Sequence, residues 1–300
     1  MDDDPPSSDE PPAQAGRGRD GLSQAPREGE HEGKVDLTET EQEQVEKRES
    51  VGSRVVHEVI RRQGDEELKR PWPSLLWSGF AAGIAISASS LGQALIEHHL
   101  PDAPWRPLVA SFGYTLGFLI VILSRLQLFT ESTLSAVIPV MTEPHRVNFA
   151  RIARLWSIVF LANILGTLFI AWLTEHGWVG LPELLPAQLA VAHAALAHAP
   201  LEVLTAGIPA GFLVAAVAWT LPSGRGQEFW IILGFTYFIA LGSFAHVVAG
   251  SGEAWLLMLH GEISLAAAVL GFIVPALIGN VIGGTCLFAL LAHAQVRHEL

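Results

Sequence analysis

The 300-residue chain contains 30 acidic and 18 basic residues, for a net charge of −12, yet half of its residues are apolar and its mean hydropathy is +0.37. This mixture excludes a single soluble domain, because the charge is concentrated at one end: residues 1–70 hold 19 acidic and 11 basic residues. A nucleic-acid-binding protein needs a basic face, and this acidic chain offers none. Its single cysteine, Cys286, excludes an intramolecular disulfide and a cysteine-rich zinc site.

The hydrophilic N-terminal part divides in two. Residues 1–35 are rich in Pro, Gly, Ser, Gln and acidic residues, and we expect a disordered acidic tail, because too few apolar groups are present to offset the loss of chain entropy. Residues 36–70 are expected to form a cytoplasmic helix. Thr38 and Glu41 have the spacing of a capping box, and valine and isoleucine recur at helical spacing over residues 51–60. Two interpretations of this helix stay open: an amphipathic helix on a membrane surface and an ordinary solvated helix.

Residues 71–300 are expected to form a membrane domain with six transmembrane helices. A helix needs roughly 20 apolar residues to cross a bilayer core, and the following stretches exceed that length: 73–97, 107–141, 150–174, 199–221, 229–259 and 264–294. Cytoplasmic loops collect Lys and Arg, and basic residues gather before the first stretch, between the second and third, between the fourth and fifth, and after the sixth. The chain also starts with acidic residues and not with a secretory signal. Both termini are therefore expected to be cytoplasmic.

The second and fifth stretches are too long for straight helices. They contain 35 and 31 residues, which at about 1.5 Å per residue would reach about 50 Å, well beyond a core of about 30 Å. Polar residues at 127–133 and the glycine-containing segments 242–246 and 250–252 mark the expected breaks. Such backbone is tolerated at membrane depth only where it is buried in protein or lines a watery cavity. The two broken helices are therefore candidate parts of a transport pathway.

An internal repeat relates the two halves of this region. Leu116–Phe118 recurs as Leu233–Phe235, and the Asn-Ile-Leu-Gly of 163–166 recurs as the Asn-Val-Ile-Gly of 280–283, both after 117 residues. Each half contains three spans, so the halves must have opposite orientations, which predicts an inverted three-plus-three repeat whose broken helices meet near the midplane. Four GxxxG pairs at repeat-related places predict close helix packing: Gly79/Gly83, Gly113/Gly117, Gly207/Gly211 and Gly279/Gly283.

Four motifs resemble the signatures of the formate/nitrite transporter family. They are Leu128–Thr130, Phe160–Gly166, His246 and Gly279–Gly284, and they occur in the family's order within residues 50–295. The resemblance implies an aquaporin-like fold and a homopentamer in the inner (plasma) membrane of the cell, each subunit with its own pore for a small monovalent anion such as formate, nitrite or hydrosulfide. Within the family the chain is similar to a divergent branch with long hydrophilic N-terminal extensions, so its acidic extension is a candidate for binding an unidentified partner. No cofactor, ATP-binding motif or metal site is expected.

The resemblance places His246 and Thr130 at the two breaks, where they differ by 116 residues. An ionisable group at the midplane is costly and is a functional hypothesis in its own right. Histidine can lend a proton to a weak-acid anion, so that a neutral acid crosses the apolar constriction at low desolvation cost. Leu128, Phe129 and Ile239 are expected to form the constrictions. The structural alternatives are a histidine that only satisfies buried backbone and a threonine that caps its own half-helix.

Five further residues are expected to support the pore: Asn163, Asn280, Arg125, Glu131 and Gly211, the last of which also departs from the family pattern. Asn163 and Asn280 are interpreted as ties between the broken backbone and the bundle rather than as substrate ligands. Arg125 and Glu131 would each be costly alone in a bilayer, which favours an ion pair between them or an arginine that reaches toward an interface. A weaker hypothesis is that they alter the charge and selectivity of the pore.

Three positions depart from the family pattern. Gly211 stands where an asparagine commonly faces the central histidine, Ala195 where a lysine commonly draws in anions, and Gln127 where an acidic residue is usual. The main alternative is therefore a membrane scaffold or stress protein with a vestigial pore. An intramembrane serine protease using Ser251 is disfavoured, because this serine follows His246 by only five residues and no oxyanion-hole motif accompanies it. We expect a non-enzyme, and the absence of paired Asn-Pro-Ala motifs disfavours an aquaporin.

Overall fold

The computed structural model describes residues 38–41, 51–180 and 182–299, which contain helices and no strand. The chain divides into two units, Met1–Glu49 and Ser50–Leu300. In the first, the Thr38 hydroxyl and backbone N–H donate to Glu41 Oε2 at 2.7 and 2.9 Å, and the Glu41 N–H donates to Thr38 Oγ1 at 3.4 Å. These are the reciprocal bonds of the expected capping box. The predicted disordered tail lies outside the described residues.

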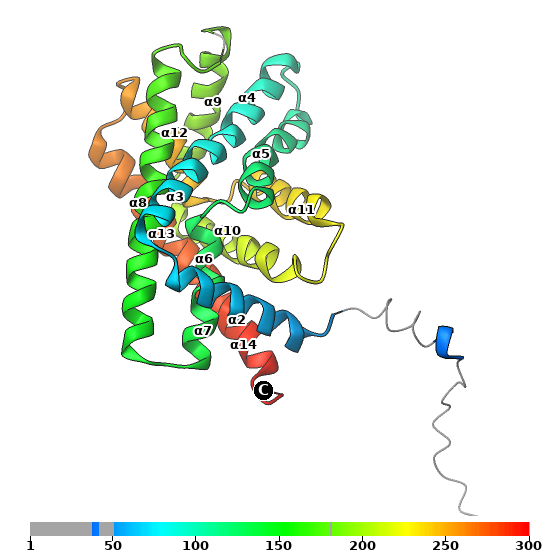
Figure 1. Cartoon of the computed structure of the whole chain (residues 1–300). Coiled ribbons are helices and arrows are strands. Elements are labelled where there is room, and N and C mark those ends of the chain that lie inside the picture. The colour runs from blue at the N-terminus through cyan, green and yellow to red at the C-terminus, as the bar shows by residue number, and fades with distance from the viewer. Residues whose placement is uncertain (1–37, 42–50, 181, 300) are drawn as a thin grey trace, which may run out of the picture. The chain divides into compact units, whose positions relative to one another are not determined.

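The second unit is a bundle of helices (Figure 1). Its first half contains α2 (Ser53–Lys69), α3 (Trp72–Ile86), α4 (Ala88–His99), α5 (Arg106–Leu123), α6 (Phe129–Ser135), α7 (Val137–Thr142) and α8 (Arg146–Glu175). Its second half contains η1 (Pro182–Leu184), α9 (Leu185–Leu196), α10 (Pro200–Thr220), α11 (Glu228–Leu241), α12 (Val247–Leu259), the π-helical η2 (Ala267–Ile273), α13 (Val274–Val281), the π-helical η3 (Ile282–Ala289) and α14 (Leu290–Val296).

Five helical runs in the described residues are long and apolar enough to cross a membrane. They are Trp72–His99, Arg106–Leu123, Arg146–Glu175, Pro200–Thr220 and Ala267–Val296. Two shorter apolar helices, α11 and α12, occupy the remaining predicted stretch at 229–259. The chain therefore forms an all-α protein with several helices suited to a bilayer.

Two helices end inside the predicted stretches by the same backbone device. Arg125 and Ser243 have positive φ angles of 53° and 50°. At the end of α5, the N–H groups of residues 125 and 126 donate to the carbonyls of residues 122 and 121. At the end of α11, the N–H groups of residues 243 and 244 donate to the carbonyls of residues 240 and 239 in the same way. This pair of bonds is a Schellman motif, which ends a helix with one left-handed residue. Thus α5 ends before α6 begins, and α11 ends before α12 begins.

The apolar face of α2 is buried against the protein. Its buried residues are Val56, His57, Ile60, Gly64 and Leu68. His57 Nε2 lies 3.1 Å from His293 Nδ1 on α14, and Glu67 accepts a 2.7 Å hydrogen bond from the Ser135 hydroxyl of α6. Burial lowers the pKa of His57 and raises that of Glu67. Both interpretations made from the sequence, a helix lying on lipid and a freely solvated helix, missed this contact, because the apolar spacing shows a buried face but not what covers it.

Glycines let the helix backbones touch. A Cβ atom at Gly83 of α3 would collide with the Asn163 backbone of α8, and one at Gly211 of α10 would collide with the Asn280 backbone at the α13 crossing. Gly113 of α5 is in equally close contact with the backbone of Gly92 of α4. The close packing predicted from the GxxxG pairs is therefore confirmed at these crossings.

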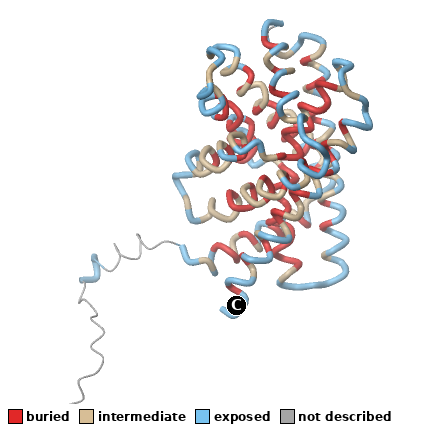
Figure 2. Tube along the Cα trace, turned by 180° about the vertical axis from the view of Figure 1, so that it is seen from behind, coloured by how far each residue is buried: buried red, intermediate tan, exposed pale blue. Residues whose placement is uncertain are grey.

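Burial is concentrated inside the second unit, whereas exposed residues lie on the outside of its helices (Figure 2). Many of the exposed side chains are large and apolar, among them Trp77, Leu161, Trp230, Leu270 and Leu291. An extensive apolar exterior is typical of a surface that contacts lipid or other subunits.

Replacing Gly83 with alanine should destabilise the bundle. The added methyl forces α3 away from α8, and overpacking of this kind costs about 1–3 kcal/mol. Gly234→Ala is the matched control, because no atom lies within 4 Å of the position that a Cβ would take there and alanine favours a helix. Thermal unfolding followed by tryptophan fluorescence in one detergent should give a lower midpoint for Gly83→Ala only; equal midpoints would contradict the backbone contact.

Candidate functional site

An asparagine from α8 holds the first interruption. The side-chain nitrogen of Asn163 donates to the carbonyls of Gly79 and Gln127 at 2.7 and 2.9 Å, and its oxygen accepts from the Phe129 N–H at 2.9 Å. Asn163 is fully buried. Three backbone groups of α3 and of the α5–α6 junction are thereby satisfied by one side chain, as a buried backbone requires.

Asn280 of α13 makes the same set of contacts at the second interruption. Its nitrogen donates to the carbonyls of Gly207 and Ala245 at 2.9 and 2.8 Å, and its oxygen accepts from the Val247 N–H at 2.9 Å. This residue is also fully buried. Every one of these hydrogen bonds joins an asparagine side chain to a backbone group. This arrangement agrees with the hypothesis that the asparagines tie the broken backbone to the bundle.

The two anchored junctions bring Thr130 and His246 together. Thr130 Oγ1 lies 2.8 Å from His246 Nε2, and both side chains are almost completely buried. His246 is the N-cap residue of α12, and its Nδ1 accepts the Ala249 N–H at 3.2 Å. This bond assigns the proton of the neutral imidazole to Nε2, which then donates to Thr130 Oγ1. Thr130 makes no cap to α6, so its own hydroxyl proton can be offered to a bound molecule.

Aromatic and aliphatic side chains surround this polar pair. The ring of Phe118 from α5 lies 4.9 Å from the His246 ring, centre to centre. Phe129 packs between the rings of Phe160 and Trp156 of α8, at 5.1 and 5.7 Å. The other predicted constriction residues, Leu128 and Ile239, are also fully buried. The sequence analysis did not predict Phe118 as a site residue. The only feature of the sequence that could have indicated it is its place in the recurring Leu-Gly-Phe motif.

Arg125 and Glu131 are not joined by an ion pair. Arg125 is exposed and has the left-handed backbone described above, whereas Glu131 is half-buried in α6. The ion pairs of the described region do not include one between these residues within 4 Å. The ion pair between them is therefore not formed in this structure, and the other expectation, an exposed Arg125 that reaches toward an interface, stays a prediction.

Ser251 lacks the partner that a serine nucleophile needs. Its hydroxyl donates to the Val248 carbonyl at 2.6 Å and lies 2.8 Å from Thr167 Oγ1, while both ring nitrogens of His246 are engaged elsewhere. A nucleophile must contact its base, so this histidine and serine do not form a catalytic pair.

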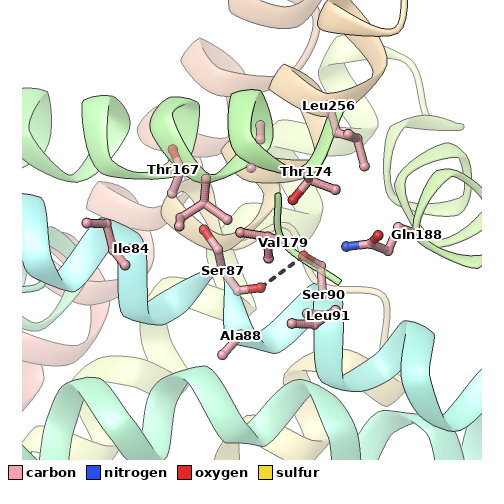
Figure 3. A pocket seen from close by; sticks show the side chains of 13 residues that line it. Ile84, Ser87, Ala88, Ser90, Leu91, Thr167, Thr174, Val179, Gln188 and Leu256 are labelled. Carbon is pink, nitrogen blue, oxygen red and sulfur yellow. Dashed lines mark hydrogen bonds between the residues drawn. The ribbon is translucent and has the colours of Figure 1, made fainter. Parts of the chain in front are cut away.

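A separate cavity of about 140 Å³ lies among α3, α4, α8, α9 and α12. Figure 3 shows hydroxyl groups around it, with the Ser90 hydroxyl donating to the Ser87 carbonyl at 3.3 Å. The Ser87 hydroxyl donates in turn to the Gly83 carbonyl at 3.0 Å. Neither Thr130 nor His246 lines this cavity. Because its serine hydroxyls bond to their own helix, the pair at the two junctions is the stronger candidate site.

Within the part of the chain that the structure describes, no cluster of three or more His, Cys, Asp or Glu residues could hold a metal ion. The hydrogen-bonding groups at the two junctions are a threonine hydroxyl and a histidine ring inside an apolar enclosure.

Comparison with known proteins gives consistent matches. Residues 54–294 match the family model described as formate/nitrite transporter. The chain is 38% identical to the inner membrane protein YfdC of Escherichia coli (strain K12) over 245 residues, which cover 82% of this chain and 79% of YfdC. It superposes on a solved FNT family ion channel with a TM-score of 0.69 and 19% identity, covering 80% and 98% of the two chains. A pentameric formate channel with formate bound gives a TM-score of 0.63 and 18% identity, with coverage of 76% and 97%.

Removing either anchoring asparagine should destabilise the protein more than removing a surface asparagine. Asn163→Ala or Asn280→Ala leaves three buried backbone groups without their partner, and each such loss costs about 1–3 kcal/mol. Asn148→Ala is the control, since Asn148 is half-buried on the first turn of α8 and bonds only locally, to Glu143 and Arg151. Unfolding midpoints of the extracted protein should fall for both buried variants. A control that loses as much stability as either of them would contradict the anchoring role.

Proposed function

The chain belongs to the formate/nitrite transporter family, and we propose that it is a channel that passes small monovalent anions, or their protonated weak acids, across a membrane. Formate is the first substrate to test, because one similar structure is described as a formate channel with formate bound. The single observation that carries the proposed pathway is the buried 2.8 Å contact between Thr130 and His246 at the two helix junctions. It supplies a hydrogen-bonding, proton-exchanging pair inside an otherwise apolar enclosure.

We propose six membrane spans in an inverted three-plus-three repeat. The equivalent contacts of Asn163 and Asn280, and the matching left-handed residues Arg125 and Ser243, support a structural correspondence between the halves. The distribution of basic loops supports cytoplasmic termini. With this orientation, α2 and α14 lie at the cytoplasmic end, and the ends of α4, α9 and α12 lie at the outer end. The similar E. coli protein supports an inner-membrane location.

The proposed mechanism begins with the cost of desolvation. A bare anion that meets Phe118, Leu128, Phe129 and Ile239 loses its hydration, whereas the neutral acid loses much less. The Thr130 hydroxyl donates a hydrogen bond to the incoming oxygen and is itself polarised by His246. Protonation of His246 at Nδ1 would break its bond with the Ala249 N–H, so a charged imidazole is formed only transiently, beside an anion that stabilises it. The Nε2 proton then passes to Thr130 Oγ1 as the Thr130 hydroxyl proton passes to the anion, which leaves a neutral ring and a neutral acid; the proton taken up at Nδ1 comes from water.

The scaffold alternative has one observation in its favour. A side chain at Gly211 would collide with the Asn280 backbone, so the asparagine that the family commonly places here cannot be accommodated without moving α10. The path would then lack one polar group. A protein with a vestigial pore would show no flux of any weak acid in proteoliposomes, whereas a channel would carry at least one.

Replacing His246 with phenylalanine should keep the ring volume and remove proton exchange. Formate and nitrite uptake into proteoliposomes, measured across a pH series, should fall by roughly 10²-fold, the contribution typical of a positioned acid–base group, and should lose its pH dependence. His176→Phe, at an exposed helix end, should behave like the wild type. If an assembled His246→Phe protein keeps the wild-type rates and pH profile, the histidine is structural.

We propose that the protein is a homopentamer, because a similar structure is described as pentameric and the helices carry many exposed apolar side chains. Native mass spectrometry of the detergent-extracted protein should show five subunits. A conducting protein that is purely monomeric would contradict this assembly.

A further inference from the structure

A second titratable residue, Glu253, is buried in α12, on the helix face that follows from its N-cap residue His246. Glu253 follows His246 by seven residues, which is two turns and about 10 Å along the helix axis. Its side chain is 95% buried, since the residue is only 5% exposed. The described part of the chain provides Glu253 with neither a side-chain hydrogen bond nor an ion pair. A buried carboxyl group inside an apolar helix bundle is costly, and packing alone does not explain it.

Two oxygen-bearing groups in this part of the bundle have no hydrogen-bond partner in the described region but keep some accessible surface. Tyr114 of α5 is 7% exposed, and its hydroxyl, like the Glu253 carboxyl, has no hydrogen-bond partner among the described residues. The indole nitrogen of Trp255 in α12 is fully enclosed and has no hydrogen-bond partner in the part of the chain that the structure describes. The oxygens of Glu253 and Tyr114 also lack a partner there, but they are not fully enclosed. The oxygens of Glu253 and Tyr114 therefore keep accessible surface although their side chains are more than nine-tenths buried.

Both residues lie on one side of the Thr130–His246 pair. Tyr114 precedes Phe118 by one helical turn and contacts it at 5.5 Å between ring centres, and Phe118 contacts His246. Glu253 lies two turns along α12 from the same histidine. Figure 1 shows α4, α9 and α12 gathered at this end of the second unit. In the proposed orientation this is the outer side.

No other titratable group on the surrounding elements is placed to compete for this role. His260, which follows the last residue of α12, pairs with Glu175 of α8, and His193 of α9 pairs with Glu262. On α4 Glu97 contacts Gln93 and Arg106, and His98 and His99 lie at the helix end. The arginines of α8 lie in its first turns, Glu131 belongs to α6 on the far side of the polar pair, and α3, η2 and α13 contain no titratable residue.

We propose that Glu253 and Tyr114 form a proton-donating site that an anion from the outer side meets before it reaches His246. The O–H bond of the Glu253 carboxylic acid breaks as an O–H bond forms on the anion, so a neutral acid moves on and a carboxylate remains. Tyr114 donates a hydrogen bond to that carboxylate until water on the outer side returns the proton. An ionised Glu253 repels the next anion, so the rate of uptake rises as the pH on the outer side falls. This inference rests on the proposed channel function.

The direct test uses Glu253→Gln, which keeps the size of the side chain but cannot give up a proton. Proteoliposomes with this variant should take up formate roughly tenfold or more slowly than the wild type at acidic external pH. Uptake should also rise less with acidity, because the anion then depends on His246 alone for its proton. Glu183→Gln, an exposed change in η1, should match the wild type. An unchanged pH profile in Glu253→Gln would overturn the inference, whereas a wild-type protein that carries no weak acid at any pH would instead refute the channel function.

A labelling measurement on the wild type does not depend on transport or on the folding of a variant. A membrane-soluble carbodiimide modifies protonated carboxyl groups, and peptide mass spectrometry locates the adduct. We expect Glu253 to be modified increasingly as the pH falls. Tyr114→Phe should shift this modification to higher pH, because the carboxylate loses its donor. No modification of Glu253 at any pH, or no shift in Tyr114→Phe, would contradict a water-accessible proton site.

Discussion

A backbone N–H or C=O group at membrane depth must find its partner inside the protein, because lipid offers none. This constraint organises the molecule. Helices α5 and α11 end at left-handed residues, and the chain that follows each of them has unpaired backbone groups. Asn163 and Asn280 satisfy those groups and also bond to the carbonyls of Gly79 and Gly207. These bonds require touching backbones, which explains why glycine is present where α3 crosses α8 and where α10 crosses α13.

The anchored junctions fix the chemistry of the site. His246 caps α12 through Nδ1, so its neutral form presents Nε2–H to Thr130. The cap and the proton-exchanging role are therefore not alternatives: the cap selects the tautomer that the proposed role uses. Apolar rings around the pair favour a neutral acid over a bare anion. Glu253 extends the same principle outward, since a carboxyl group that faces water can supply the proton before the substrate enters the apolar region.

The sequence predicted what depends on composition and spacing. Membership of the formate/nitrite transporter family and the all-α class are confirmed, and the glycine crossings follow from their four-residue spacing. The six-span count, the inverted repeat and the roles of the site residues remain predictions. The end of α5 was misplaced, because the expected break at 127–133 begins after Arg125, a poor candidate for a left-handed conformation compared with glycine. Ser243, by contrast, lies inside the expected break at 242–246. The sequence did not predict Phe118 or Glu253 as site residues. A phenylalanine in a span usually indicates packing, and in the segment beside Glu253 the candidate residue was Ser251. The sequence also did not predict which helices cover the apolar face of α2, because α6 and α14 are distant from it in the chain.

The central claim is that the substrate crosses the polar pair as a neutral acid. Formate uptake into proteoliposomes, with the membrane potential set by a potassium gradient and valinomycin at constant pH, tests it directly. Moving one charge through the full potential changes its energy by about 2.3 kcal/mol per 100 mV, so uptake of the bare anion would depend steeply on voltage. Neutral-acid passage predicts the same uptake rate at every potential. A rate that rises several-fold as the interior becomes positive would contradict the claim.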